Sequence, residues 1–177
     1  MDERPSRPQP HTSRSDALER LYDAHGAAMY RHALMVLADP GAAEDAVQQV
    51  FVKLAARRGL SQDVRDPRGY LRTAVRNACY EILRRSKRPQ PLPDSGPILV
   101  PARDTLADED ERREVEQALR LLPPDQREVV HMKVYEQMTF QQIADACGVS
   151  INTAASRYRL AMEKLRVRLA RFAGPQK

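Results

Sequence analysis

The chain has 177 residues, of which 42% are hydrophobic, 30% are charged and 5% are aromatic, and its formal net charge is +5. This length suits one ordinary domain or two small ones. The longest apolar run, 33–38, is far shorter than the roughly 20 residues that span a bilayer, and the polar start does not resemble a signal peptide. Cys79 and Cys147 cannot form a disulfide framework. We therefore expect a cytoplasmic protein with no membrane insertion.

Apolar residues recur at helical spacing along the first half of the chain, after a polar, proline-containing tail at 1–14 that we expect to be disordered. The first predicted helix begins at the cap Ser15 and ends before the Asp-Pro-Gly stop signal at 39–41. The second covers 42 to about 57. The third opens at 66–67, where an aspartate cap precedes a proline, and runs to about 86.

The segment from Arg88 to Asp104 contains five prolines and no sustained period, which predicts an extended linker. An acidic block follows at 104–116, and then a second set of helices. Its first apolar stripe ends at the prolines 123–124, after which Asp125 is a candidate helix cap. No β-type alternation of useful length occurs, so we predict an all-α fold of two small helical domains joined by a Pro-rich linker.

The segment 138–171 has the features of a helix-turn-helix. Thr139 and Gln142 are spaced as a capping box, Gly148 suits the turn, and Ser150 can cap the following helix. The outward positions near the start of that helix would then face the major groove, and they are Asn152, Thr153, Ser156, Arg157 and Arg159. Seven basic residues against one acid between 151 and 177 favour a phosphate backbone. The alternative is an amphipathic hairpin with a solvated basic face.

The third predicted helix is also basic, and it carries Tyr70, which can stack on a base, and Asn77, which can hydrogen-bond a base edge. A core tyrosine and a solvated charged face remain the alternative. The start of the second helix carries Glu44, Asp45, Gln48 and Gln49. Acids in a first turn favour the helix dipole, and the other interpretation of this group is a docking face for a partner protein.

Both halves together resemble bacterial group IV sigma factors, the extracytoplasmic-function (ECF) relatives of sigma-70 that keep only regions 2 and 4. The helix that binds the β′ coiled coil of RNA polymerase, region 2.2, is similar to AEDAVQQVFVKLA at 43–55. Regions 2.3 and 2.4, which open the promoter and read the −10 element, resemble DPRGYLRTAVRNACYEILRRSKR at 66–88. Region 4, with its −35-reading helix-turn-helix, is similar to 119–169.

The resemblance implies a division into an N-terminal tail (1–14), region 2 (15–87), a flexible linker (88–111), region 4 (112–172) and a short tail (173–177). It implies that the chain binds core RNA polymerase through the β′ coiled coil and the β flap and directs transcription initiation on promoter DNA. An anti-sigma factor is a further expected partner. No cofactor, metal or catalytic residue is expected.

The resemblance and the positions of the residues on their helices together assign residues to these roles. Those expected to read the −35 element are Asn152, Thr153, Ser156, Arg157 and Arg159. Those expected to read or melt the −10 element are Tyr70, Arg72, Arg76, Asn77, Arg84 and Arg85. Those expected to bind the polymerase are Glu44, Asp45, Gln48 and Gln49, whereas Phe51 on the same helix is expected in the core. Ala155 and Leu160 stand where basic residues are common, so we expect an unusual −35 preference.

Two other classes of protein fit the sequence less well. A stand-alone helix-turn-helix regulator would bind duplex DNA without polymerase, but no ligand-pocket signature or dimerising heptad is visible in the sequence. An enzyme would need a constellation that the chain lacks, since its histidines (His11, His25, His32 and His131) are scattered without metal-binding spacing. Cys79 and Cys147 lie on apolar helix faces, as buried small hydrophobes do.

Overall fold

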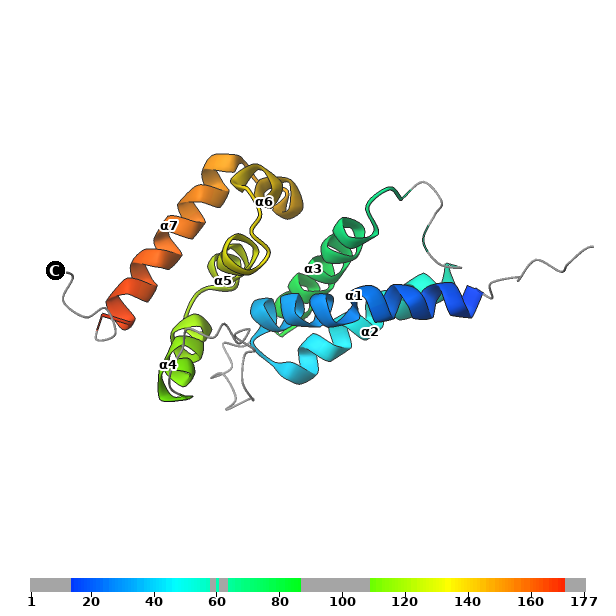
Figure 1. The fold of residues 1–177 in the computed structure, drawn as a ribbon, viewed down its shortest axis with the longest axis horizontal. Helices are drawn as coiled ribbons and strands as arrows, with labels where there is room; N and C mark the ends of the chain where they lie inside the picture. The colour runs from blue at the N-terminus through cyan, green and yellow to red at the C-terminus, as the bar shows by residue number, and fades with distance from the viewer. Residues whose placement is uncertain (1–13, 58–59, 61–63, 87–108, 171–177) are drawn as a thin grey trace, which may run out of the picture.

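The computed structural model describes residues 14–57, 60, 64–86 and 109–170, and the regular structure in these ranges is helical, which confirms the all-α prediction. The elements are α1 (Arg14–Leu37), α2 (Pro40–Ala56), α3 (Pro67–Arg85), α4 (Glu109–Arg120), α5 (Pro124–Val130), the π-helix η1 (His131–Tyr135), α6 (Phe140–Cys147) and α7 (Ile151–Arg168) (Figure 1). The predicted tails and linker lie outside the described residues, apart from 14, which begins α1, and 109–111, which begin α4.

Helices α1, α2 and α3 pack together as a first bundle around one apolar core. Asp39 and Asp66 cap α2 and α3, each accepting a hydrogen bond from a first-turn backbone N–H, and a proline follows each cap. The segment 39–41 therefore starts α2 at Pro40, two positions before the predicted start, because proline needs no hydrogen bond at the first helical position. Phe51 is buried in this core, as expected.

Helices α4 to α7 form a second bundle with two apolar clusters, one between α4, α5 and α7 and one between α5, η1, α6 and α7. Asp125 does not cap α5, contrary to the prediction. Pro123 holds the cap position and Pro124 the first helical position, which moves Asp125 into the first turn. Its carboxylate instead accepts a hydrogen bond from the Gln126 backbone and pairs with Arg157.

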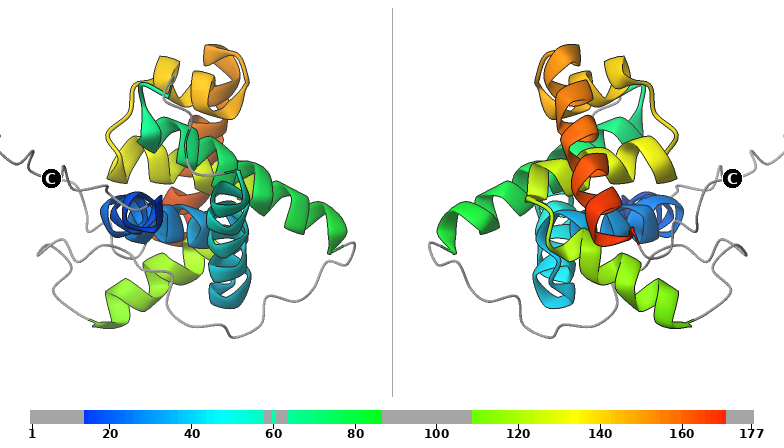
Figure 2. Two further views of the ribbon diagram at one scale, coloured as in Figure 1. Left: turned by 90° about the vertical axis from the view of Figure 1, so that its right-hand side faces the viewer. Right: turned by 90° about the vertical axis from the view of Figure 1, so that its left-hand side faces the viewer.

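The two bundles pack against each other, which the sequence did not predict. Met35 and Ala38, at the end of α1, are buried in the cluster formed by α4, α5 and α7. Helix α5 contacts α1, and α6 contacts α3. Figure 2 shows α5 (yellow) beside α1 (blue) from two opposite sides. The first helix therefore contributes to the cores of both bundles.

Arg127 on α5 fastens this contact. Its guanidinium is buried and donates to five backbone carbonyls at two helix ends: Met35 and Val36 in α1, and Leu119, Arg120 and Leu122 at the end of α4. The last carbonyls of a helix lack helical partners and carry partial negative charge. Burial lowers the pKa of Arg127 to about 10, so the side chain remains charged at neutral pH.

We expect Arg127→Met to lower the free energy of unfolding by about 3 kcal/mol or more. Several buried carbonyls lose their donor, and each unsatisfied group costs about 1–3 kcal/mol. Urea denaturation measures the loss, with Arg166→Met, at an exposed site on α7, as the control. A loss below about 0.5 kcal/mol, typical of a surface substitution, would show that the Arg127 hydrogen bonds do not stabilise the contact between the bundles.

Candidate nucleic-acid interface

Helices α6 and α7 form the predicted helix-turn-helix. The capping box is confirmed: the Gln142 backbone donates to Thr139 Oγ1 at 3.2 Å, and the Thr139 backbone donates to Gln142 Oε1 at 2.8 Å. Gly148 ends α6 with φ 66°, a left-handed conformation that glycine adopts without steric cost. Ser150 caps α7 by accepting from the Thr153 backbone at 3.1 Å.

The turn presents one face of α7 to solvent. Ala154, Ala161 and Leu165 are buried against the bundle. On the opposite side, four of the five predicted −35 residues are exposed: Asn152, Thr153, Ser156 and Arg159. Thr153 also shares a 2.8 Å hydrogen bond with the Ser150 hydroxyl, so its side chain belongs to the cap as well as to the surface.

Arg157, the fifth of these residues, is occupied by an acid of its own bundle. Its Nε lies 3.0 Å from Asp125 Oδ2, and its side chain is 26% exposed. The ion pair joins the start of α5 to the first half of α7. Half-exposed ion pairs contribute little free energy, so a stronger anion can displace Asp125.

Helix α3 presents three different faces. One is buried in the first bundle. A second is exposed and carries Tyr70, Asn77, Arg84 and Arg85, with Arg85 paired to Glu81. Tyr70 and Asn77 line a hollow of about 180 Å³ between α2 and α3, which Lys53 and Arg57 also line. An aromatic ring, an amide and two cations thus surround one opening, together with the carboxylate of Glu81.

The third face of α3 carries the remaining −10 candidates, Arg72 and Arg76, and it packs against the second bundle. Arg72 Nη1 donates to Glu136 Oε2 at 2.8 Å, and Arg76 Nε lies 2.9 Å from Glu128 Oε1. Tyr80, one turn further along, donates its hydroxyl to Glu128 Oε2 at 2.9 Å. The sequence predicted these two arginines as DNA contacts but not their carboxylate partners.

Glu128 is fully buried at the centre of this contact and also lies 3.3 Å from His32 Nε2 on α1. Burial alone would raise the pKa of Glu128, but His32, Arg76 and Tyr80 stabilise its ionised form and lower the pKa below its usual value. Burial and this carboxylate raise the pKa of the Tyr80 hydroxyl, which therefore remains a donor. The buried charge of Glu128 is stable only when its partners are in place, because removing one partner leaves an uncompensated charge in the interior.

The predicted polymerase-binding residues lie together on α2. Glu44, Asp45, Gln48 and Gln49 are all exposed, and Gln48 donates to Glu44 across one turn at 3.2 Å. The residues between them face the core of the first bundle. This face of α2 is therefore polar, acidic and open to a partner.

Comparisons with known proteins identify both bundles. The family model described as "Sigma-70 region 2" matches residues 21–89, and "Sigma-70, region 4" matches residues 112–165. The chain is 30% identical over 160 residues to the ECF RNA polymerase sigma factor SigK of Mycolicibacterium vanbaalenii, across 86% of this chain and 81% of the relative. The chain belongs to the ECF group of RNA polymerase sigma factors.

Other relatives agree. RNA polymerase sigma-E factor of Streptomyces coelicolor is 30% identical over 146 residues, across 80% of each chain. ECF RNA polymerase sigma factor SigL of Mycobacterium tuberculosis is 27% identical over 156 residues, across 86% of this chain and 88% of the relative. The fold is similar to that of the sigma factor RpoE from Bartonella quintana, solved in complex with the anti-sigma factor NepR. That match has a TM-score of 0.68 and 23% identity, and it covers 87% of this chain and 97% of that one.

Membership of this family confirms the predicted role, which is to direct transcription initiation rather than to catalyse a reaction. A region 2 match does not fit the stand-alone regulator. No described helix has the length and apolar character needed to cross a bilayer. Both cysteines are buried, and burial raises the pKa of the Cys79 thiol to about 12 and that of Cys147 to about 11, which suits packing rather than reactivity.

We expect Glu128→Gln to loosen the contact between the bundles. The substitution keeps the size of the side chain but leaves Arg76 and His32 without their anion, and removing one partner of a buried pair costs about 3–5 kcal/mol. Small-angle X-ray scattering should give a larger radius of gyration, and thermal unfolding a lower midpoint. Glu163→Gln, at an exposed site on α7, is the matched control. Equal values for Glu128→Gln and the wild type would show that the pair does not hold the bundles together.

Proposed function

We propose that this sigma factor reads the −35 element with the exposed face of α7, and that Asn152, Thr153, Ser156, Arg157 and Arg159 make the contacts. The observation that carries the proposal is the capped helix-turn-helix, which leaves a basic helix face open beside a rigid turn. A second helix held in this way enters the major groove by its N-terminal half. Arg157 then exchanges Asp125 for a phosphate or a base edge.

The −10 element is read and opened by α3. Tyr70 and Asn77 line one hollow together with Lys53 and Arg57, which supplies a stacking surface, a hydrogen-bonding amide and two cations at one opening. Opening a duplex costs unpairing and unstacking energy, and a flipped base held in a pocket recovers part of it. Arg84 and Arg85 extend the same exposed face along the helix.

Core polymerase binds the acidic face of α2 through its β′ coiled coil, and its β flap binds region 4. Exposed Glu44 and Asp45 give this face a charge opposite to that of the DNA-binding surfaces. The factor acts in the cytoplasm, where its polymerase and promoters are.

The free protein has to open before all of its −10 residues reach DNA. Arg72 and Arg76 are held by Glu136 and Glu128, whereas Tyr70, Asn77, Arg84 and Arg85 are accessible in the closed arrangement. Polymerase binding separates the two bundles and releases the arginines. An anti-sigma factor, like the one bound to the Bartonella structural relative, acts by preventing this change.

The decisive functional test is run-off transcription with core polymerase on fragments of the source genome, using the full chain. We expect start sites that are absent with core polymerase alone, and we expect Asp45→Ala to reduce their yield at subsaturating factor because polymerase binding weakens. Asp23→Ala, an exposed acid on α1, is the control. Absence of specific start sites would contradict the proposed function. An unchanged yield with Asp45→Ala would contradict the proposal that this face of α2 binds the polymerase.

We expect Arg159→Ala and Arg157→Ala to weaken binding to a promoter found in that assay. Each change removes a phosphate or base contact, so the slope of log K against log salt should fall by about one. Fluorescence anisotropy over a salt series measures both quantities. Arg168→Ala, at the far end of α7, is the control. An unchanged slope in both variants would show that this face does not contact DNA.

A further inference from the structure

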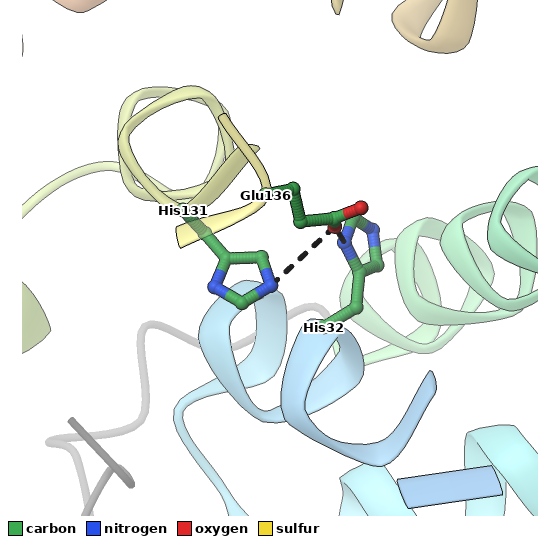
Figure 3. Close-up of side chains that lie close together, drawn as sticks. All are labelled: His32, His131 and Glu136. Atoms are coloured by element: carbon green, nitrogen blue, oxygen red, sulfur yellow. Dashed lines mark ion pairs between the residues drawn. The ribbon is translucent and has the colours of Figure 1, made fainter. Parts of the chain in front are cut away.

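Two histidines and a glutamate meet where the bundles touch. His32 comes from α1 in the first bundle, His131 begins η1 in the second, and Glu136 follows η1 directly. Figure 3 shows the three side chains pointing toward one another. One potential ligand atom from each lies within 4.8 Å of the other two. This cluster could not be predicted from the sequence, because the two histidines belong to different domains.

We propose that His32, His131 and Glu136 bind a divalent transition-metal ion, with Zn²⁺ as the preferred ion, and that this ion ties the two bundles together. Glu136 Oε1 lies 3.7 Å from His32 Nδ1 and 3.6 Å from His131 Nε2. Zn²⁺ holds nitrogen and oxygen ligands at about 2.0–2.2 Å in a tetrahedron, which places neighbouring ligands about 3.3 Å apart. Each carboxylate–histidine distance needs to shorten by only a few tenths of an ångström, whereas the two histidine nitrogens, which lie within 4.8 Å of each other, need to approach by up to about 1.5 Å.

The ligand types select the class of metal. Two imidazoles with one carboxylate suit Zn²⁺ and its neighbours in the transition series, whereas Mg²⁺ and Ca²⁺ prefer oxygen ligands alone. Three protein ligands leave a fourth position for water. Glu136 also lines a hollow of about 540 Å³ between α3 and the second bundle, which brings solvent to the carboxylate side of the cluster, whereas neither histidine lines it.

The surroundings orient two of the three ligands, His32 and Glu136, as a metal requires. Glu128 lies 3.3 Å from Nε2 of His32 and can keep the proton there, which leaves Nδ1 for the ion. Arg72 binds Oε2 of Glu136, so that Oε1 faces the histidines. Such outer partners fix the tautomer of a histidine ligand and the orientation of a carboxylate.

The buried histidine nitrogens have few hydrogen-bond partners within the protein that could compete with a metal ion. Within the described residues, Nδ1 of His131 makes no hydrogen bond, and the His32 nitrogens have only carboxylate contacts, at 3.3 Å from Glu128 and 3.7 Å from Glu136, although both rings are almost fully buried.

The local charges set a limit on the affinity. Glu128 and Glu136 together match the charge of a divalent ion, but Arg72 and Arg76 stand behind them. We therefore expect weaker binding than at a four-ligand structural zinc site, and affinity that depends on the closed arrangement.

The binding test uses the full chain without an affinity tag, titrated with Zn²⁺ alone by isothermal calorimetry and with Co²⁺ by visible absorption. We expect one ion per chain. His131→Gln and Glu136→Gln should each weaken binding more than 10-fold, and Glu128→Gln by about 10–100-fold through its outer-partner role. His25→Gln, which replaces another histidine of α1, should bind like the wild type. Glu136→Gln keeps the side-chain size, so its affinity for the ion tests the proposed site even if His131→Gln fails to fold.

No saturable binding, or equal affinity in the wild type and Glu136→Gln, would overturn the site and leave the cluster as an ion-paired contact only. The regulatory consequence rests on the proposed function: the ion should suppress run-off transcription by the wild type but not by His131→Gln, because it holds Arg72 and Arg76 in the closed arrangement. Equal suppression of both would overturn this consequence. Absence of transcription at every zinc concentration would overturn the proposed function without bearing on the calorimetric result.

Discussion

Two consecutive residues of α5, Arg127 and Glu128, are buried with opposite charges, and the relation between the two bundles depends on them. Successive residues of a helix point about 100° apart, so the pair reaches two separate places. Arg127 binds the carbonyls at the ends of α1 and α4, and Glu128 binds the side chains of α1 and α3. A buried charge is tolerated only with its partners in place, so two independent anchors fix the orientation of region 4 on region 2.

This constraint gives α3 its divided role. The helix must fill the core of region 2, meet region 4 and, as proposed, read DNA, and its three faces separate these tasks. Tyr70 and Asn77 lie on the open face, whereas Arg72 and Arg76 lie on the face that region 4 covers. The basic helix α3 thus carries both exposed residues and arginines that are paired with carboxylates of region 4. The net charge of the helix does not distinguish the two groups.

Local signals in the sequence predicted local structure well. The capping box at Thr139, the turn at Gly148 and the cap at Asp66 each satisfy backbone groups within a few residues, so their geometry follows from spacing alone. Contacts between the bundles could not be predicted in this way, because the linker separates the partners in sequence and leaves their register open. Arg127 and Glu128 carried no signal of burial either, because they stand in a polar run at 125–128, directly before the apolar residues 129–130, where charged side chains are usually exposed.

The chemistry of the contact suits a joint that opens. Its apolar part is small and centres on Met35 and Ala38, while much of the rest consists of arginines, histidines and carboxylates. Apolar residues often replace a buried ion pair without loss of stability, so a permanent joint gains little from charges. Arg72 and Arg76 bind carboxylates as they would bind phosphates, through charge-assisted hydrogen bonds. We propose that DNA supplies those phosphates, so that each arginine exchanges a carboxylate partner for a phosphate partner. Separating the two bundles then costs less free energy than separating an apolar interface of the same area would.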